Sequence, residues 1–208
     1  MSAETWVPAG AGIDELRASA AGCRGCELWE PATQVVFSAG NPKGPMMLVG
    51  EQPGDQEDRR GIPFVGPAGQ LLQRALAEAG VAVADVYVTN AVKHFRFTER
   101  GKRRIHATPQ VTHIKACRPW LEAEVADVDP QLVVALGATA AKSMLGPAFR
   151  ITAQRGTVLE LPPPFGPRPV LATIHPSAVL RTQGGPEHDA AFAGLVADLR
   201  TAAAAVAG

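Results

Sequence analysis

The chain has 208 residues, and its 20 Lys and Arg balance its 20 Asp and Glu, so the formal net charge is zero. Hydrophobic residues make up 46% of the chain and charged residues 19%, which provides apolar material for one sizeable core. We therefore expect one domain over residues 1–208. The zero net charge excludes attraction to nucleic acid through overall charge, so only a local basic patch would provide it.

Membrane and disulfide signals are both weak in this sequence. No apolar run approaches the roughly 18 residues that cross a bilayer, and the N-terminus has no basic region followed by an apolar stretch. We therefore expect a cytoplasmic protein without membrane contact, and we expect a monomer. The 3 cysteines are too few, and odd in number, for a disulfide framework, so ligation is the favoured interpretation.

In chain order, apolar spacing and Gly or Pro punctuation predict strands that alternate with helices. The expected strands are residues 46–49, 86–92, 132–136, 156–161 and 170–174. The expected helices are residues 13–21, 67–79, one that begins at Pro109 and breaks or kinks near Pro119, 138–145, and a C-terminal helix that frays after Thr201. This alternation predicts a three-layer α/β/α fold, in which helices cover both faces of a central, mostly parallel sheet of about four strands.

The stretch from Met46 to Gly69 has the character of a binding-site wall. A buried strand runs into Gly50-Glu51-Gln52-Pro53-Gly54, which puts Glu51 at the carboxyl end of the strand, where open α/β sheets form their ligand crevices. Residues 61–69 follow, with Phe64 held between Pro63 and Gly66 as a rigid aromatic platform. Either half alone is also typical of a solvated turn, but together they predict a site.

Two other polar residues lie at comparable places. Asn90 ends one expected strand and His175 follows another, so both are expected to converge with Glu51 on one crevice. An Asn amide offers an acceptor and two donors, the inventory needed to read a pyrimidine edge. A lone Asn is also a common turn former, and a lone His is commonly a packed or surface residue.

The cysteines and the basic connection give two further patterns. Cys23 and Cys26 are separated by two residues, a gap that lets two thiolates ligate one metal or cluster, and Cys117 lies far along the chain. Six cations between residues 93 and 104 face a single acid, which is typical either of phosphate binding or of a solvated loop. These cations are Lys93, Arg96, Arg100, Lys102, Arg103 and Arg104.

These motifs, in this order, resemble the uracil-DNA glycosylase superfamily. The residues that carry the resemblance are 50–54, 61–69, Thr89-Asn90, His175-Pro176-Ser177 and Leu180-Arg181. The chain is most similar to the iron-sulfur branch, and within it to the UdgX type, which bonds covalently to the DNA that it has deglycosylated. The combination of motifs is highly specific and spans roughly residues 23–181.

The resemblance implies a role for each of these residues. Phe64 would stack on a flipped uracil, Asn90 would hydrogen-bond its edge, and His175 would support charge on the departing base. Glu51 would stabilise the oxocarbenium ion or orient a nucleophile. The implied substrate-binding wall includes Gly50 and Gln52, with Gln52 positioning either the base or the loop that carries His106; the implied DNA contacts include Ser177 and Arg181.

For the metal, the resemblance implies a 4Fe-4S cluster. Iron-sulfur relatives have a cysteine after the strand that carries the recognition Asn, and this chain has His94 there. We therefore expect the ligands Cys23, Cys26, His94 and Cys117, with His113 as the competing fourth ligand. Zinc bound by the same Cys3His set is the alternative.

The segment Lys102-Arg103-Arg104-Ile105-His106 matches the loop motif of the UdgX type. This match makes His106 the implied covalent nucleophile. It makes Lys102, Arg103 and Arg104 the implied contacts to uracil-containing DNA, which we expect to be single-stranded. A conventional glycosylase in which Glu51 activates water is one alternative. A non-catalytic iron-sulfur module that binds nucleic acid is another.

Overall fold

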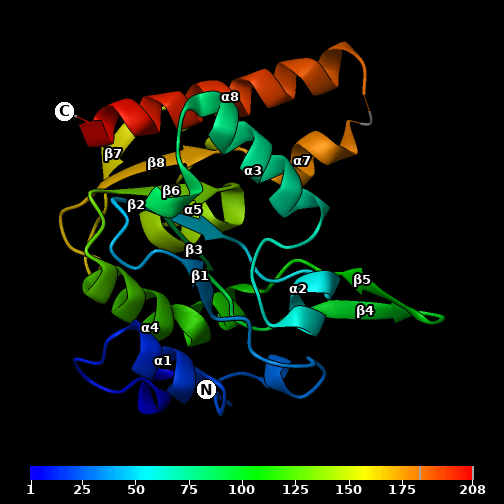
Figure 1. Ribbon diagram of the computed structural model, residues 1–208. Coiled ribbons are helices and arrows are strands. Elements are labelled where there is room, and N and C mark those ends of the chain that lie inside the picture. Colours follow the sequence, from blue (N-terminus) through cyan, green and yellow to red (C-terminus); the bar gives the residue numbers. More distant parts are fainter. Residues whose placement is uncertain (183, 208) are drawn as a thin grey trace.

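The computed structural model describes residues 1–182 and 184–207, and its centre is a six-stranded sheet (Figure 1). The sheet has the order β1-β3-β2-β6-β8-β7, in which β3, β2, β6 and β8 are parallel and both edge strands are antiparallel. A separate hairpin pairs β4 with β5. The strands are β1 Ser38–Gly40, β2 Met46–Gly50, β3 Val86–Asn90, β4 Phe97–Arg100, β5 Arg103–His106, β6 Leu132–Leu136, β7 Val158–Glu160 and β8 Pro169–Thr173.

Helices cover both faces of the sheet, as the alternating pattern predicts (Figure 1). On β2, Met47 and Val49 belong to a core layer that also contains buried residues of α1, α4 and α5, whereas Met46 and Leu48 belong to the layer that contains those of α3, α7 and α8. The period-2 alternation of strand side chains thus divides the core into two layers. The helices are α1 Ile13–Ala20, α2 Asp55–Arg60, α3 Pro67–Ala79, α4 Val111–Val128, α5 Ala138–Leu145, α6 Ile151–Gln154, α7 Pro176–Arg181 and α8 Pro186–Ala207, with short 3-10 turns at Glu4–Trp6, Glu27–Trp29 and Val83–Asp85.

The three-layer fold and the mostly parallel sheet are confirmed, but the predicted break at Pro119 and the predicted fraying after Thr201 are wrong. Helix α4 runs through Pro119 without a break, because burial of Cys117 before the proline and of Trp120 after it holds both sides in the core. Helix α8 continues beyond Thr201 to Ala207, since alanine has the highest helix propensity and Ala202 is fully buried.

The sheet is also larger than the expected four strands. The parallel strands number four, and the short antiparallel edge strands β1 and β7 extend them to six. The basic connection contains the β4–β5 hairpin, whose turn has Gly101 at a φ of 60° (Figure 1). Among the described residues, no helix is both long and apolar enough to span a lipid bilayer.

Candidate active site

A cavity of about 740 Å³ opens at the carboxyl ends of the parallel strands. Its wall includes Glu51 after β2, Asn90 at the end of β3, Gly137 after β6 and His175 after β8. The same wall contains His106, which ends the hairpin strand β5. The structure therefore brings together the side chains that the sequence places at strand ends, at the edge where parallel α/β sheets bind ligands.

Phe64 and Asn90 meet over Gly50, and their packing explains why that position is a glycine. A Cβ atom on Gly50 would lie 2.7 Å from Cζ of Phe64 and would collide with Oδ1 of Asn90. Phe64 itself has a φ of 56°, a strained value for a bulky residue. Gly69 makes room for this backbone, since a Cβ there would collide with the Phe64 carbonyl. Gly50 thus provides clearance for the aromatic ring and the amide.

His175 faces the ring of Phe64, with centroids 6.4 Å apart and planes 28° from parallel. Its Nδ1 accepts a hydrogen bond from the backbone N–H of Ser177 at 3.1 Å, so the neutral ring carries its hydrogen on Nε2. Burial, helped by the nearby His106 and Arg181, lowers the pKa of His175 to about 4. At neutral pH His175 is therefore an uncharged hydrogen-bond donor.

Glu51 and His106 approach each other in the wall of the cavity. Nε2 of His106 lies 3.4 Å from Oε1 of Glu51, and the two side chains are 49% and 20% exposed. The imidazole also lies near Phe95, with ring centroids 6.1 Å apart. A carboxylate and an imidazole are thus placed side by side in the wall of a pocket that also contains an aromatic ring, an amide and a neutral histidine.

Comparison with known proteins identifies the family. The sequence profile of the Uracil DNA glycosylase superfamily matches residues 37–200. The chain belongs to this superfamily. It is 38% identical over 162 residues to the Type-4 uracil-DNA glycosylase of Thermotoga maritima, a match that covers 77% of this chain and 79% of the relative. It is 33% identical over 185 residues to the Type-4 uracil-DNA glycosylase of Archaeoglobus fulgidus, covering 86% of this chain and 89% of the relative.

In this superfamily member, Gln52 ties the cavity to the base of the hairpin. Its Nε2 donates to the carbonyl oxygens of Arg96 at 3.1 Å and Ala107 at 3.2 Å, and its Oε1 accepts from the Arg96 N–H at 3.2 Å. Arg96 and Ala107 flank the hairpin on its two sides. The buried amide of Gln52 is therefore engaged with the hairpin backbone, which favours the predicted role in positioning the His106 loop over contact with the base.

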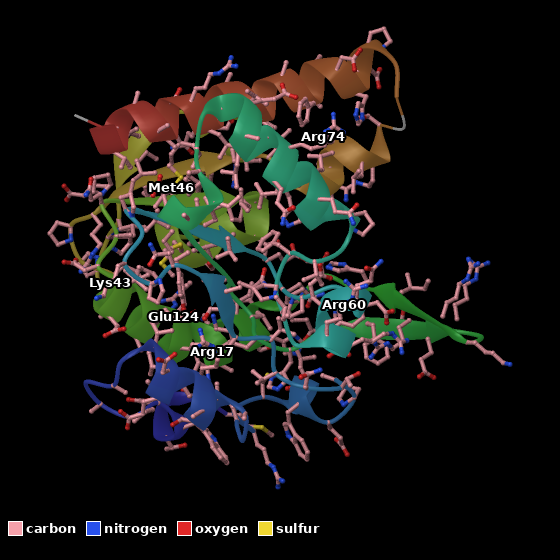
Figure 2. The ribbon with its side chains drawn as sticks, in the orientation of Figure 1. Arg17, Lys43, Met46, Arg60, Arg74 and Glu124 are labelled. Atoms are coloured by element: carbon pink, nitrogen blue, oxygen red, sulfur yellow. The ribbon has the colours of Figure 1, made fainter. Side chains whose placement is uncertain are left out.

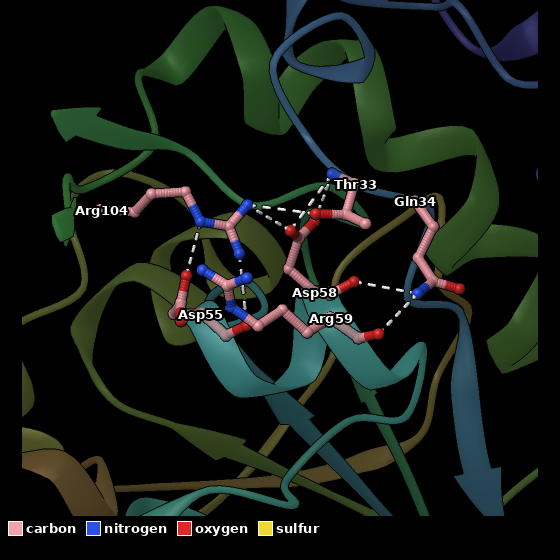
Figure 3. A network of polar contacts seen from close by, with 6 residues as sticks. All are labelled: Thr33, Gln34, Asp55, Asp58, Arg59 and Arg104. Atoms are coloured by element: carbon pink, nitrogen blue, oxygen red, sulfur yellow. Dashed lines mark hydrogen bonds and ion pairs between the residues drawn. The ribbon is translucent and has the colours of Figure 1, made fainter. Parts of the chain in front are cut away.

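Arg104 anchors the hairpin from its inner face (Figure 3). Its Nε pairs with Asp55 at 2.5 Å and its Nη1 with Asp58 at 2.7 Å, both on the short helix α2. The guanidinium also lies 4.9 Å from the centroid of the Phe97 ring. Only 13% of the Arg104 side chain is exposed, and its guanidinium is paired with two carboxylates of the protein. This geometry does not support its predicted contact to DNA.

The other predicted DNA contacts differ in their exposure. Lys102 and Arg103 are exposed on the hairpin, which projects from the body of the molecule (Figure 2). Arg181 is exposed on α7 and donates to Oγ of Ser177 at 3.4 Å, beside His175. Lys93, in contrast, is 1% exposed and forms an ion pair with Glu124, so its place among the phosphate-binding cations is wrong.

The three cysteines are buried in one core layer, and His94 is buried as well. The Lys93 backbone N–H donates to Sγ of Cys117 and the Trp120 indole N–H to Sγ of Cys23, each at 3.3 Å. Burial raises the pKa of Cys117 to about 12, so its thiolate requires a compensating cation. Within residues 1–182 and 184–207, no group of three or more His, Cys, Asp or Glu side chains is arranged to hold a metal ion.

The two candidate histidine ligands have different surroundings. Both ring nitrogens of His113 are engaged: Nδ1 accepts from the Gln110 N–H at 3.0 Å, and Nε2 lies 2.6 Å from Oε1 of Glu27. Burial lowers the pKa of His94 to about 4, which keeps that imidazole neutral and suitable as a ligand. Of the two histidines, His94 is therefore the more available as a fourth ligand beside the three thiols.

Sequence reasoning missed Asp55, Asp58 and Gly137. The two aspartates are three residues apart on α2, a spacing that puts both on one helix face, and this was the available signal. Gly137 has a φ of 91°, and a Cβ there would lie 2.9 Å from Cβ of His175. Its place directly after a buried strand, in front of a helix, was the corresponding signal.

Proposed function

We propose that this protein is a uracil-DNA glycosylase that excises uracil from DNA and is then captured, through His106, by the abasic sugar. The observation that carries the proposal is the shared cavity. It places a stacking ring, an amide, a neutral imidazole and a carboxylate around one space, with His106 3.4 Å from that carboxylate. Family membership and the relatives named as Type-4 uracil-DNA glycosylases support the excision step.

Recognition of the base follows from the donors and acceptors in the cavity. A uracil flipped out of the strand would stack on Phe64 and exchange hydrogen bonds with the Asn90 amide. As the bond between base and sugar breaks, its electron pair moves to the uracil ring, and Nε2–H of His175 donates to the oxygen that gains charge. A ring with a pKa near 4 is uncharged at neutral pH and supplies this stabilisation as a hydrogen bond, without transferring its proton.

The sugar left behind has oxocarbenium character at its anomeric carbon. The Glu51 carboxylate stabilises this positive charge, as carboxylates do in glycosidases. One ring nitrogen of His106 then forms a bond to that carbon, and the ring gives up a proton, for which Glu51 is the nearby acceptor. The excised uracil anion is finally protonated. The new carbon–nitrogen bond has a poor leaving group, so the protein stays attached after one turnover.

Conventional turnover is the second candidate. Glu51 is partly exposed and lines the cavity, so it is placed to activate a water molecule in competition with His106. The relatives share the name of uracil-DNA glycosylase, which is consistent with either fate of the sugar. The two candidates differ only in which nucleophile reaches the anomeric carbon first.

One gel experiment separates the candidates. The protein is mixed with a single-stranded oligonucleotide that contains one uracil, and the products are separated in SDS and assayed for free uracil. Covalent capture predicts a shifted band in equal amount to the released uracil, and His106→Ser should remove the band while uracil is still released. Excess free uracil without a shifted band supports conventional turnover. No uracil release by the wild type rejects both.

For the cofactor, we propose a 4Fe-4S cluster held by Cys23, Cys26, Cys117 and His94, with zinc as the alternative. When bound, the cluster supplies a structural cross-link between the N-terminal segment, the end of β3 and α4. The test is the metal content of purified protein: His94→Ala should lose iron, whereas His113→Gln should retain it. Zinc in stoichiometric amount, or iron loss only in His113→Gln, would contradict the assignment.

We further propose that the substrate is single-stranded DNA. The exposed cations Lys102 and Arg103, with Arg181 near the cavity, are suited to the phosphates that flank a flipped nucleotide. Single-stranded DNA needs no unpairing before the base is flipped, which favours it as substrate. Action as a cytoplasmic monomer remains our prediction.

A further inference from the structure

Lys93 is a buried cation that the chemistry above does not use. Its side chain is 1% exposed and folds back toward the end of β3, the strand that ends three residues earlier. The ammonium donates to Oγ1 of Thr89 at 2.6 Å, to the backbone carbonyl of Asn90 at 2.9 Å, and to the Glu124 carboxylate. These contacts use all three ammonium donors.

The carboxylate partner is itself fully held. Glu124 lies on α4 (Figure 2) and is completely buried. Its second oxygen accepts from the Tyr87 hydroxyl at 2.8 Å. Burial, and then the charge of Glu124, raises the pKa of Tyr87, so the phenol remains a donor. A buried ion pair with every donor and acceptor satisfied fixes the groups around it in one geometry.

The Asn90 carbonyl lies at the end of β3, where no neighbouring strand in the described part of the chain donates a ladder hydrogen bond to it. On one side of β3, pairing with β2 continues past Asn90, because the Ala91 N–H donates to the Gly50 carbonyl at 2.9 Å. On the other side, pairing with β1 begins at Thr89, so the ladder does not extend to Asn90. The Lys93 ammonium takes the place of the missing neighbour strand and holds this carbonyl.

The same residue reaches the thiol cluster through its backbone. The Lys93 N–H donates to Sγ of Cys117, and the next residue in the chain is His94. The turn from Asn90 to His94 is therefore fixed at its start by a side chain and at its end by a backbone contact, both from Lys93. The base-reading amide and the buried thiols are joined through one residue.

We propose that Lys93 is a positioning residue for Asn90, and that the buried Lys93–Glu124 pair sets the uracil-reading amide against Gly50 and Phe64. This inference rests on the proposed function of Asn90. The competing explanation is that Lys93 only neutralises Glu124. In that case, removing both charges together would leave uracil recognition intact.

The test uses the double variant Lys93→Met/Glu124→Gln, which removes both charges and keeps an acceptor for Tyr87. Tyr87→Phe is the matched control, because it removes a contact of the same network but leaves Lys93 on Asn90. Thermal unfolding confirms folding, and uracil release is measured under single-turnover conditions. We expect the double variant to lose about 10- to 100-fold in rate, the effect of a misplaced contact group, and the control to stay within about twofold.

A mutant cycle shows whether the loss passes through Asn90. Combined with Asn90→Ala, the double variant should lower the rate by less than about twofold further, since the group that it positions is gone. An undiminished loss in the Asn90→Ala background, or a folded double variant within about twofold of wild type, overturns the proposal. If the double variant does not fold, Glu124→Gln alone is used, with an expected loss of at least about threefold that disappears with Asn90→Ala.

Failure of the proposed function is recognised separately, by wild-type protein that releases no uracil. The positioning claim is then decided by NMR of the Asn90 side-chain amide. In wild type and in Tyr87→Phe, the two amide protons should give one sharp pair of resonances. In the folded double variant, which lacks the Lys93–Glu124 ion pair, these resonances should broaden or move toward those of a solvent-exposed Asn. Unchanged resonances in that variant would overturn the inference.

Discussion

Replacement of Arg104 by Met tests how the hairpin that carries His106 is held. The methionine keeps apolar contact with Phe97 but removes the cation that pairs with Asp55 and Asp58. Breaking a buried ion pair costs about 3–5 kcal/mol. Asp58 is fully buried but keeps the Thr33 N–H at 3.0 Å and 3.1 Å from its two oxygens, so we expect the lower end of that range, about 3 kcal/mol.

For a protein of this size, a loss of about 3 kcal/mol corresponds to a fall of about 6–12 °C in Tm. Arg103→Met is the matched control, because Arg103 is the exposed neighbour on the same strand and should change stability by less than about 0.5 kcal/mol. In the functional assay, Arg104→Met should lower the yield of covalent adduct more than the rate of uracil release, since His106 loses its support while the base pocket does not. Equal stability of the two variants would refute the anchoring role of Arg104.

Three further predictions concern the cavity. Gly50→Ala should fold but release uracil at least about tenfold more slowly, because its Cβ would lie 2.7 Å from Cζ of Phe64. The check is the single-turnover rate of a variant whose Tm matches that of the wild type, and an unchanged rate would contradict the prediction. Gln52→Ala should shift the outcome from adduct toward free uracil, because three contacts to the hairpin base are lost, and the ratio of the two products on a gel measures this. His175 has a folded-state pKa of about 4, below its unfolded value of about 6.5, so the unfolded state binds more protons between these values. The free energy of unfolding should therefore fall as the pH drops from about 6.5 to about 4. His175→Asn should make the free energy of unfolding depend less steeply on pH, and an identical dependence would argue against a buried neutral ring.

The positions of Glu51, Asn90 and His175 were predictable because they follow from a local rule. Each lies at or after the end of a buried parallel strand, and such ends meet at one edge of the sheet. The strands and most helices were predictable for the same reason, since apolar periodicity reports on burial directly. The hairpin was not, because its sequence is polar and Gly101 was the only turn signal.

The sequence did not predict which cations form ion pairs and which are exposed. Arg104 and Arg103 are adjacent and chemically identical, yet only Arg104 meets acids that lie 46 and 49 residues away along the chain. Lys93 meets Glu124 across 31 residues. Pairing of this kind depends on how α2 and α4 pack, which local patterns do not encode. The choice between His94 and His113 had the same limit, because it depends on the contact of His113 with Glu27 in a distant segment.

Covalent capture requires that His106 reach the anomeric carbon before water does. Mass spectrometry of the peptide that contains residue 106, after reaction with a uracil-containing single strand and digestion of protein and DNA, shows whether it does. We expect this peptide to gain the mass of a deoxyribose phosphate, with fragmentation placing it on His106. An unmodified His106 peptide, recovered after each protein molecule has released more than one uracil, would contradict it.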